Sequence, residues 1–179
     1  DNEYELPGLD VTISKQDVAG KEIPHATLKL TSLDGYDLSG VSVVQRTNGK
    51  PMDFVLSDNN TAISFDTIEN DWAIIIGLRA GKYDLEETVT PEAFLKADKI
   101  TIELHRDGTF TDNGGTIWVQ GSPLIMIDKA DPTWGGPKLP PTGEETSITS
   151  IAGVVCIALC AFTLTGLGVY RAKKKREEA

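Results

Sequence analysis

Short runs of apolar residues, separated by turn signals, fill the first 130 residues of the chain. Apolar and polar side chains alternate within the runs with the period of two that is typical of half-buried strands. The pattern predicts ten strands, at Leu9–Lys15, Ala26–Thr31, Val41–Arg46, Phe54–Leu56, Ala62–Phe65, Ala73–Leu78, Tyr83–Thr88, Lys99–Leu104, Thr116–Val119 and Leu124–Ile127. Turn dipeptides lie between several of them: Asp34-Gly35, Asn48-Gly49, Asp107-Gly108 and Asn113-Gly114. No long amphipathic helix is indicated here, so the predicted fold class is all-β, with the architecture of an Ig-like β-sandwich.

A different pattern begins after this region. Residues Ile148 to Tyr170 form an apolar run of 23 residues without a charge, which is long enough to cross a bilayer as a helix. A buried core helix is the alternative, but it would show a polar stripe, and the run has none. Five Lys and Arg residues follow between Arg171 and Arg176. Because basic residues stay on the cytoplasmic side, the pattern predicts a single span that runs from outside to inside, followed by a basic tail.

Three ionisable residues occupy places where the strand pattern predicts apolar side chains. Lys15, Glu87 and Asp128 each extend an apolar row along one face of a predicted strand. The rows are Val11, Ile13, Lys15; then Tyr83, Leu85, Glu87; and then Leu124, Met126, Asp128. A single polar residue at a strand end is usually a sign that the strand leaves the core. Three of complementary charge indicate a buried cluster, either an ionic one or a reactive one.

Composition narrows the function classes. Residues 1–143 carry 12 Lys and Arg residues against 23 Asp and Glu residues, which argues against nucleic-acid binding and suits an exposed ectodomain. Both cysteines, Cys156 and Cys160, lie in the apolar run, so no disulfide stabilises the predicted sandwich. His25 and His105 are far apart in the sequence with no cysteine nearby, so neither a metal site nor a cofactor is expected.

The residues just before the apolar run resemble the LPXTG cell-wall sorting signal of Gram-positive surface proteins. They are Leu139, Pro140, Pro141, Thr142 and Gly143, and the resemblance extends to the spacer, the apolar segment and the basic tail. The two prolines favour an extended backbone that an enzyme groove can bind. The resemblance implies that a sortase cleaves after Thr142 and transfers its carboxyl group to an amine, either of a peptidoglycan precursor or of a pilin lysine. A simple single-pass anchor with a Pro-rich linker is the alternative.

The predicted sandwich resembles a Cna B-type domain, also called SpaA-like or pilin-like. The resemblance is carried by three segments in the right order: Val11–Asp17 with Gly20–Leu28, then Leu78–Pro91, and then Leu124–Lys129. It implies a spontaneous isopeptide bond between Lys15 and Asp128, assisted by Glu87 as a proton shuttle. The chain departs from the family pattern at Pro91-Glu92-Ala93-Phe94, where members often have Pro-Asp-Gly-Tyr. The stretch 40–78 is longer than usual and holds either extra strands or a binding loop.

The sequence therefore predicts a secreted protein that lies in the membrane before sorting and on the Gram-positive cell wall after it. Its expected function is that of a structural stalk or anchor, not an enzyme. A host-ligand-binding adhesin module, with an extracellular-matrix ligand bound through residues 40–78, and an ancillary or base pilus subunit are the alternatives. The expected organisation is a linker from a missing upstream region (1–8), the sandwich (9–130), a linker with the sorting signal (131–147), a membrane helix (148–170) and the tail (171–179).

Overall fold

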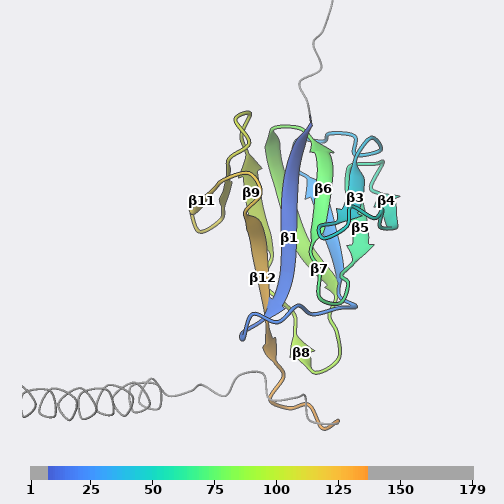
Figure 1. Cartoon of the computed structure of the whole chain (residues 1–179), viewed down its shortest axis with the longest axis vertical. Coiled ribbons are helices and arrows are strands. Elements are labelled where there is room, and N and C mark those ends of the chain that lie inside the picture. Colours follow the sequence, from blue (N-terminus) through green and yellow to red (C-terminus); the bar gives the residue numbers. More distant parts are fainter. Residues whose placement is uncertain (1–7, 137–179) are drawn as a thin grey trace, which may run out of the picture. The chain divides into compact units, whose positions relative to one another are not determined.

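A computed structural model describes residues 8–136 of the chain, which form two β-sheets packed face to face (Figure 1). The first sheet has the strand order β3 (Ser42–Gln45), β6 (Ala73–Leu78), β1 (Leu9–Asp17), β12 (Pro123–Ala130), β8 (Phe94–Leu95). The second has the order β11 (Ile117–Trp118), β10 (Phe110–Asp112), β9 (Ile100–Leu104), β7 (Gly81–Val89), β2 (Thr27–Ser32), β5 (Ala62–Asp66), β4 (Phe54–Ser57). The prediction of an all-β sandwich is confirmed.

All ten predicted strands are present, with ends that differ by a few residues, and two further strands join them. The additional strands are β8 and β10, which have two and three residues and are defined by their pairing rather than by a period-two run. The stretch 40–78 forms the strands β3 to β6 and the connections between them. Near Asn113-Gly114 the positive φ falls on Gly115, so this turn lies one residue later than the dipeptide suggests.

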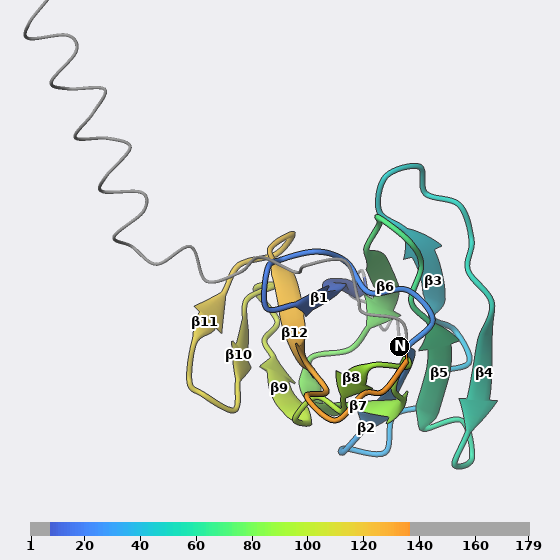
Figure 2. The same ribbon diagram turned by 90° about the horizontal axis from the view of Figure 1, so that it is seen from below.

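The core lies between the two sheets, as Figure 2 shows from below, with β1 and β12 on one side and β7 and β2 on the other. Buried apolar residues from both sheets fill it, among them Ile13 of β1, Leu30 of β2 and Leu85 of β7. Removing such side chains from water is the main favourable contribution to the free energy of folding. Tyr83 is fully buried too, and its hydroxyl donates a hydrogen bond of 2.8 Å to the carbonyl oxygen of Arg79.

The first and last strands of the sandwich are neighbours. Within residues 8–136, neighbouring strands of each sheet pair antiparallel with one exception: β1 and β12 pair in parallel, from Thr12 opposite Pro123 to Asp17 opposite Asp128. Because the two strands are parallel, the start of β1 and the end of β12 lie at opposite ends of the sandwich (Figure 1).

Within residues 8–136 the structure contains no helix, and hence none that could cross a membrane. The predicted membrane helix, the basic tail and the sorting signal Leu139–Gly143 lie outside the described residues, as does most of the N-terminal linker. The membrane helix, the basic tail and the sorting signal therefore remain predictions from the sequence.

Candidate functional site

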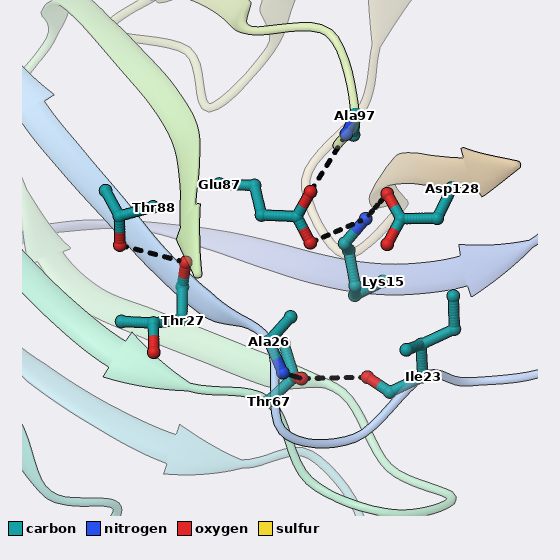
Figure 3. A network of polar contacts seen from close by, with 9 residues as sticks. All are labelled: Lys15, Ile23, Ala26, Thr27, Thr67, Glu87, Thr88, Ala97 and Asp128. Carbon is teal, nitrogen blue, oxygen red and sulfur yellow. Dashed lines mark hydrogen bonds and ion pairs between the residues drawn. The ribbon is translucent and has the colours of Figure 1, made fainter. Parts of the chain in front are cut away.

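Lys15, Glu87 and Asp128 meet inside the sandwich (Figure 3). They come from three strands: Lys15 from β1, Asp128 from the adjacent β12, and Glu87 from β7 of the facing sheet. Each is at most 1% exposed. The period-two rows thus face the core, since the other members of each row are also buried. The structure brings together all three residues that the sequence singled out in this region.

The Lys15 amine lies between the two carboxyl groups. Its Nζ contacts Oδ1 of Asp128, a residue 113 positions later in the chain, and is 3.4 Å from Oε1 of Glu87. The register explains the contact with Asp128, because Lys15 is opposite Met126 and therefore reaches diagonally to the next inward-facing residue of β12. The parallel pairing of the two strands is what places the amine beside the carboxyl group.

The segment that follows β1 folds back and hydrogen-bonds to the backbone around Lys15. The N–H of Ile23 donates to the carbonyl oxygen of Lys15 at 2.8 Å, and Glu22 forms an isolated bridge with Gln16. The Glu22 carboxylate accepts hydrogen bonds from Ser14 Oγ at 2.5 Å and from Trp72 Nε1 at 2.6 Å. This network fixes the position of β1 next to the cluster.

Only one oxygen of Glu87 accepts a hydrogen bond. Its Oε2 accepts a hydrogen bond of 2.8 Å from the backbone N–H of Ala97, in the segment that follows β8 (Figure 3). Its Oε1 is buried without a hydrogen-bond partner, and so is Oδ2 of Asp128. Two buried carboxyl oxygens without hydrogen bonds are costly if both groups are ionised, and a proton held on one of these carboxyl groups lowers that cost.

Burial raises the pKa of Asp128 to about 6 from an ordinary value of 3.8. The Lys15 ammonium acts in the opposite direction and lowers this pKa, while the neighbouring Glu87 raises it. Burial therefore favours the neutral form of the Asp128 carboxyl group. A neutral carboxyl group is a better acyl electrophile than a carboxylate, and the fold holds the Lys15 amine in contact with it.

The sequence did not reveal the role of Ala97, because every residue except proline has a backbone N–H and the side-chain pattern does not distinguish this one.

The departure at Pro91-Glu92-Ala93-Phe94 does have a structural consequence. Ala93 adopts a φ of 71°, in the left-handed region that glycine occupies without strain. Ala93 stands where the family pattern has glycine, and the turn leads into β8.

Within the part of the chain that the structure describes, no group of three or more His, Cys, Asp or Glu side chains is placed to hold a metal ion. The acidic turn at Asp58, Asn59 and Asn60 has positive φ at all three residues, and Asp58 pairs with Lys29 at 2.6 Å. The Asp58 side chain therefore forms an ion pair with Lys29 of β2.

A family model described as SpaA, prealbumin-like fold domain, matches residues 9–115, which are more than half of the chain. The chain belongs to this family. The resemblance to SpaA-like domains that the sequence suggested is therefore confirmed. The matched region of the SpaA domain contains Lys15 and Glu87, whereas Asp128 lies beyond its end.

Several solved structures are similar to the SpaA domain. A pilus-presented adhesin, Cpa, has 20% identity and a TM-score of 0.41, with 64% of this chain and 21% of the adhesin covered. The group B streptococcus pilus 2b backbone protein has 18% identity and a TM-score of 0.41, covering 69% of this chain and 41% of its own.

The C-terminal domain of the shaft pilin SpaA from Lactobacillus rhamnosus GG has 13% identity and a TM-score of 0.35, covering 69% and 98%. The chain thus spans about a fifth of the adhesin and less than half of the backbone protein. No curated protein matches it.

Proposed function

We propose that the SpaA domain joins Lys15 to Asp128 through an isopeptide bond of its own making, and that it serves as a load-bearing stalk domain on a cell surface. The observation that carries the proposal is the buried amine in contact with one carboxyl group and within 3.4 Å of a second. The family resemblance assigns the same residues to this bond: Lys15 and Asp128 as its partners, and Glu87 as the proton shuttle.

The reaction needs no outside reagent. The neutral amine of Lys15 attacks Cγ of Asp128, a C–N bond forms, and one carboxyl oxygen of Asp128 leaves as water. Of the two protons in that water, one comes from the amine and one from the neutral carboxyl group. Glu87 transfers the amine proton: it accepts a proton from the nitrogen and supplies one to the leaving oxygen, and it ends as it began. The fold replaces a second reactant by holding the groups together.

The alternative is a permanent ionic cluster. Such a cluster would keep one positive and two negative groups in the core, with two carboxyl oxygens left without hydrogen bonds. Desolvation makes buried ions costly even when they are paired. Conversion of Lys15 and Asp128 to an amide removes two of the three charges, which favours the covalent product.

The position of the bond suits a stalk. A pull on the two ends of the domain enters β1 at Leu9 and leaves β12 at Ala130, at opposite ends of the sandwich. With Lys15 bonded to Asp128, the load passes along β1, crosses the bond and continues along the end of β12. The ten other strands lie between these two residues in sequence and carry no load.

A tryptic digest of the full chain tests the bond. Cleavage at Lys15 is blocked when its amine is acylated, so we expect residues 1–21 to appear joined to residues 107–129 in one branched peptide that lacks one water. Glu87→Gln keeps the shape of the side chain but cannot exchange a carboxyl proton. We therefore expect this variant to give residues 107–129 as a separate peptide, and residues 1–21 to be cleaved after Lys15. Separate peptides from the unaltered chain would contradict the proposal.

The sorting signal Leu139–Gly143 completes the proposed function. In this account a sortase cleaves between Thr142 and Gly143 and joins Thr142 to peptidoglycan or to a pilin, so that the domain stands on the Gram-positive cell surface. Family membership and the order of signal, apolar run and basic tail support this location.

Incubation of the chain with a sortase and a triglycine acceptor is expected to release a product that ends in Thr142 with the acceptor attached, as mass analysis would show. Thr142→Ala serves as the matched control and should stay uncleaved. Cleavage of both chains, or of neither by several sortases, would argue for a simple membrane anchor instead.

A further inference from the structure

One segment contacts both carboxyl-bearing strands at the proposed bond. Phe94 and Leu95 of β8 pair with Ala130 and Lys129 of β12, directly after Asp128. Two residues later, the N–H of Ala97 donates to Glu87 of β7. The segment 93–99 therefore sets the position of Glu87 relative to Asp128, although it carries no reactive side chain at the site.

Several contacts fix this segment. The N–H of Asp131 donates to the carbonyl oxygen of Ala93 at 2.8 Å. Two ion pairs bind the segment to β7, since Lys96 is 2.7 Å from Glu86 and Lys99 is 2.6 Å from Asp84. The Ala97 side chain itself is buried in the core. The N–H of Ala97 is thus held in a defined place rather than on a free loop.

The hydrogen bond to Oε2 makes the two oxygens of Glu87 unequal. A protonated carboxyl group has one oxygen that donates through its proton and one that acts mainly as an acceptor. The N–H of Ala97 can only donate, so Oε2 is favoured as the acceptor and the proton is favoured on Oε1. Oε1 is the oxygen that lies 3.4 Å from the Lys15 amine.

We infer that the backbone N–H of Ala97 is a positioning group for bond formation: it directs the Glu87 proton to Oε1, so that one oxygen both receives the proton of the amine and supplies the proton of the leaving water. This inference rests on the proposed isopeptide bond. Oε2 stays hydrogen-bonded throughout, and the N–H stabilises the carboxylate that exists while the proton is away.

Two replacements at position 97 separate the N–H from the methyl group. Ala97→Gly keeps the N–H and removes the buried methyl group. Lactic acid at position 97 keeps the methyl group and replaces the N–H with an ester oxygen, without the ring that Ala97→Pro would introduce. The full chain is made by cell-free translation in detergent micelles during a short labelling pulse, and the loss of one water is then followed by mass spectrometry.

We expect the lactic-acid chain to form the bond about 10- to 100-fold more slowly than the unaltered chain, which corresponds to loss of one hydrogen bond to a charged group. Ala97→Gly should remain within about threefold of the unaltered chain. A role in packing alone would give the reverse order, with Ala97→Gly the slower of the two.

Equal rates for the unaltered and lactic-acid chains would overturn the inference while leaving the isopeptide bond in place. If the unaltered chain never loses one water, both the isopeptide bond and the positioning role of Ala97 are contradicted. A lactic-acid chain that is slow but shows the same thermal midpoint as Ala97→Gly, each measured with Lys15→Ala to prevent the bond, supports positioning over a general loss of stability.

Discussion

Pulled by its two ends, the SpaA domain is expected to show no unfolding step, whereas Glu87→Gln should lengthen by about 400 Å in one step. The difference follows from the 113 positions between Lys15 and Asp128, at an extended length of about 3.5 Å per residue. In the unaltered domain the proposed bond would divert the load past these residues. In Glu87→Gln the load reaches the hydrogen bonds between β1 and its neighbours, which can break.

Single-molecule force spectroscopy on tandem repeats of the domain measures this length directly. Asp128→Ala provides a second chain without the bond and should lengthen by the same amount as Glu87→Gln. A step of several hundred ångströms in the unaltered domain would show that load does pass through the sandwich, and the stalk account would then be wrong.

Loss of the bond is also expected to lower the free energy of unfolding by about 5 kcal/mol, since the loop that it closes spans 113 positions and a crosslink restricts the unfolded chain. For a domain of this size, the thermal midpoint should fall by about 15 to 25 °C. Removing one partner of a buried ion pair has a similar effect, so a single substitution does not distinguish the two accounts.

A triple variant distinguishes them: Lys15→Met, Glu87→Gln and Asp128→Leu together. It replaces the amine and the Asp128 carboxyl group with apolar groups of similar volume and keeps an acceptor for the N–H of Ala97. If the site were only ionic, this exchange would be neutral or stabilising. With a covalent bond, the variant should lose about 5 kcal/mol and gain a larger denaturant slope, because its unfolded chain is no longer crosslinked. Calorimetry and denaturant titration measure both quantities.

Much of the sandwich could be predicted from local patterns. Period-two rows gave the main strands, and they placed Lys15, Glu87 and Asp128 on core-facing sides because a row of alternating residues keeps one face. The short strands β8 and β10 could not be predicted this way. A strand of two or three residues has no measurable period, and its existence depends on the partner strand.

The arrangement of the site depended on contacts between distant residues. No pattern in the sequence states that β1 and β12 are parallel neighbours with Lys15 opposite Met126, and the family resemblance was what linked Lys15 to Asp128. The hydrogen bond from Ala97 to Glu87 was out of reach for a different reason, since any residue except proline offers the same N–H. The sorting signal at Leu139–Gly143 remains a prediction from sequence.

The intact mass of the chain truncated after Gly136 tests the central claim most directly, with Lys15→Ala and Asp128→Ala as controls. The account predicts that the unaltered chain is lighter than its calculated mass by one water and that both controls have their full calculated masses. The full calculated mass for the unaltered chain would contradict the account and leave an ordinary SpaA sandwich with a buried ionic cluster.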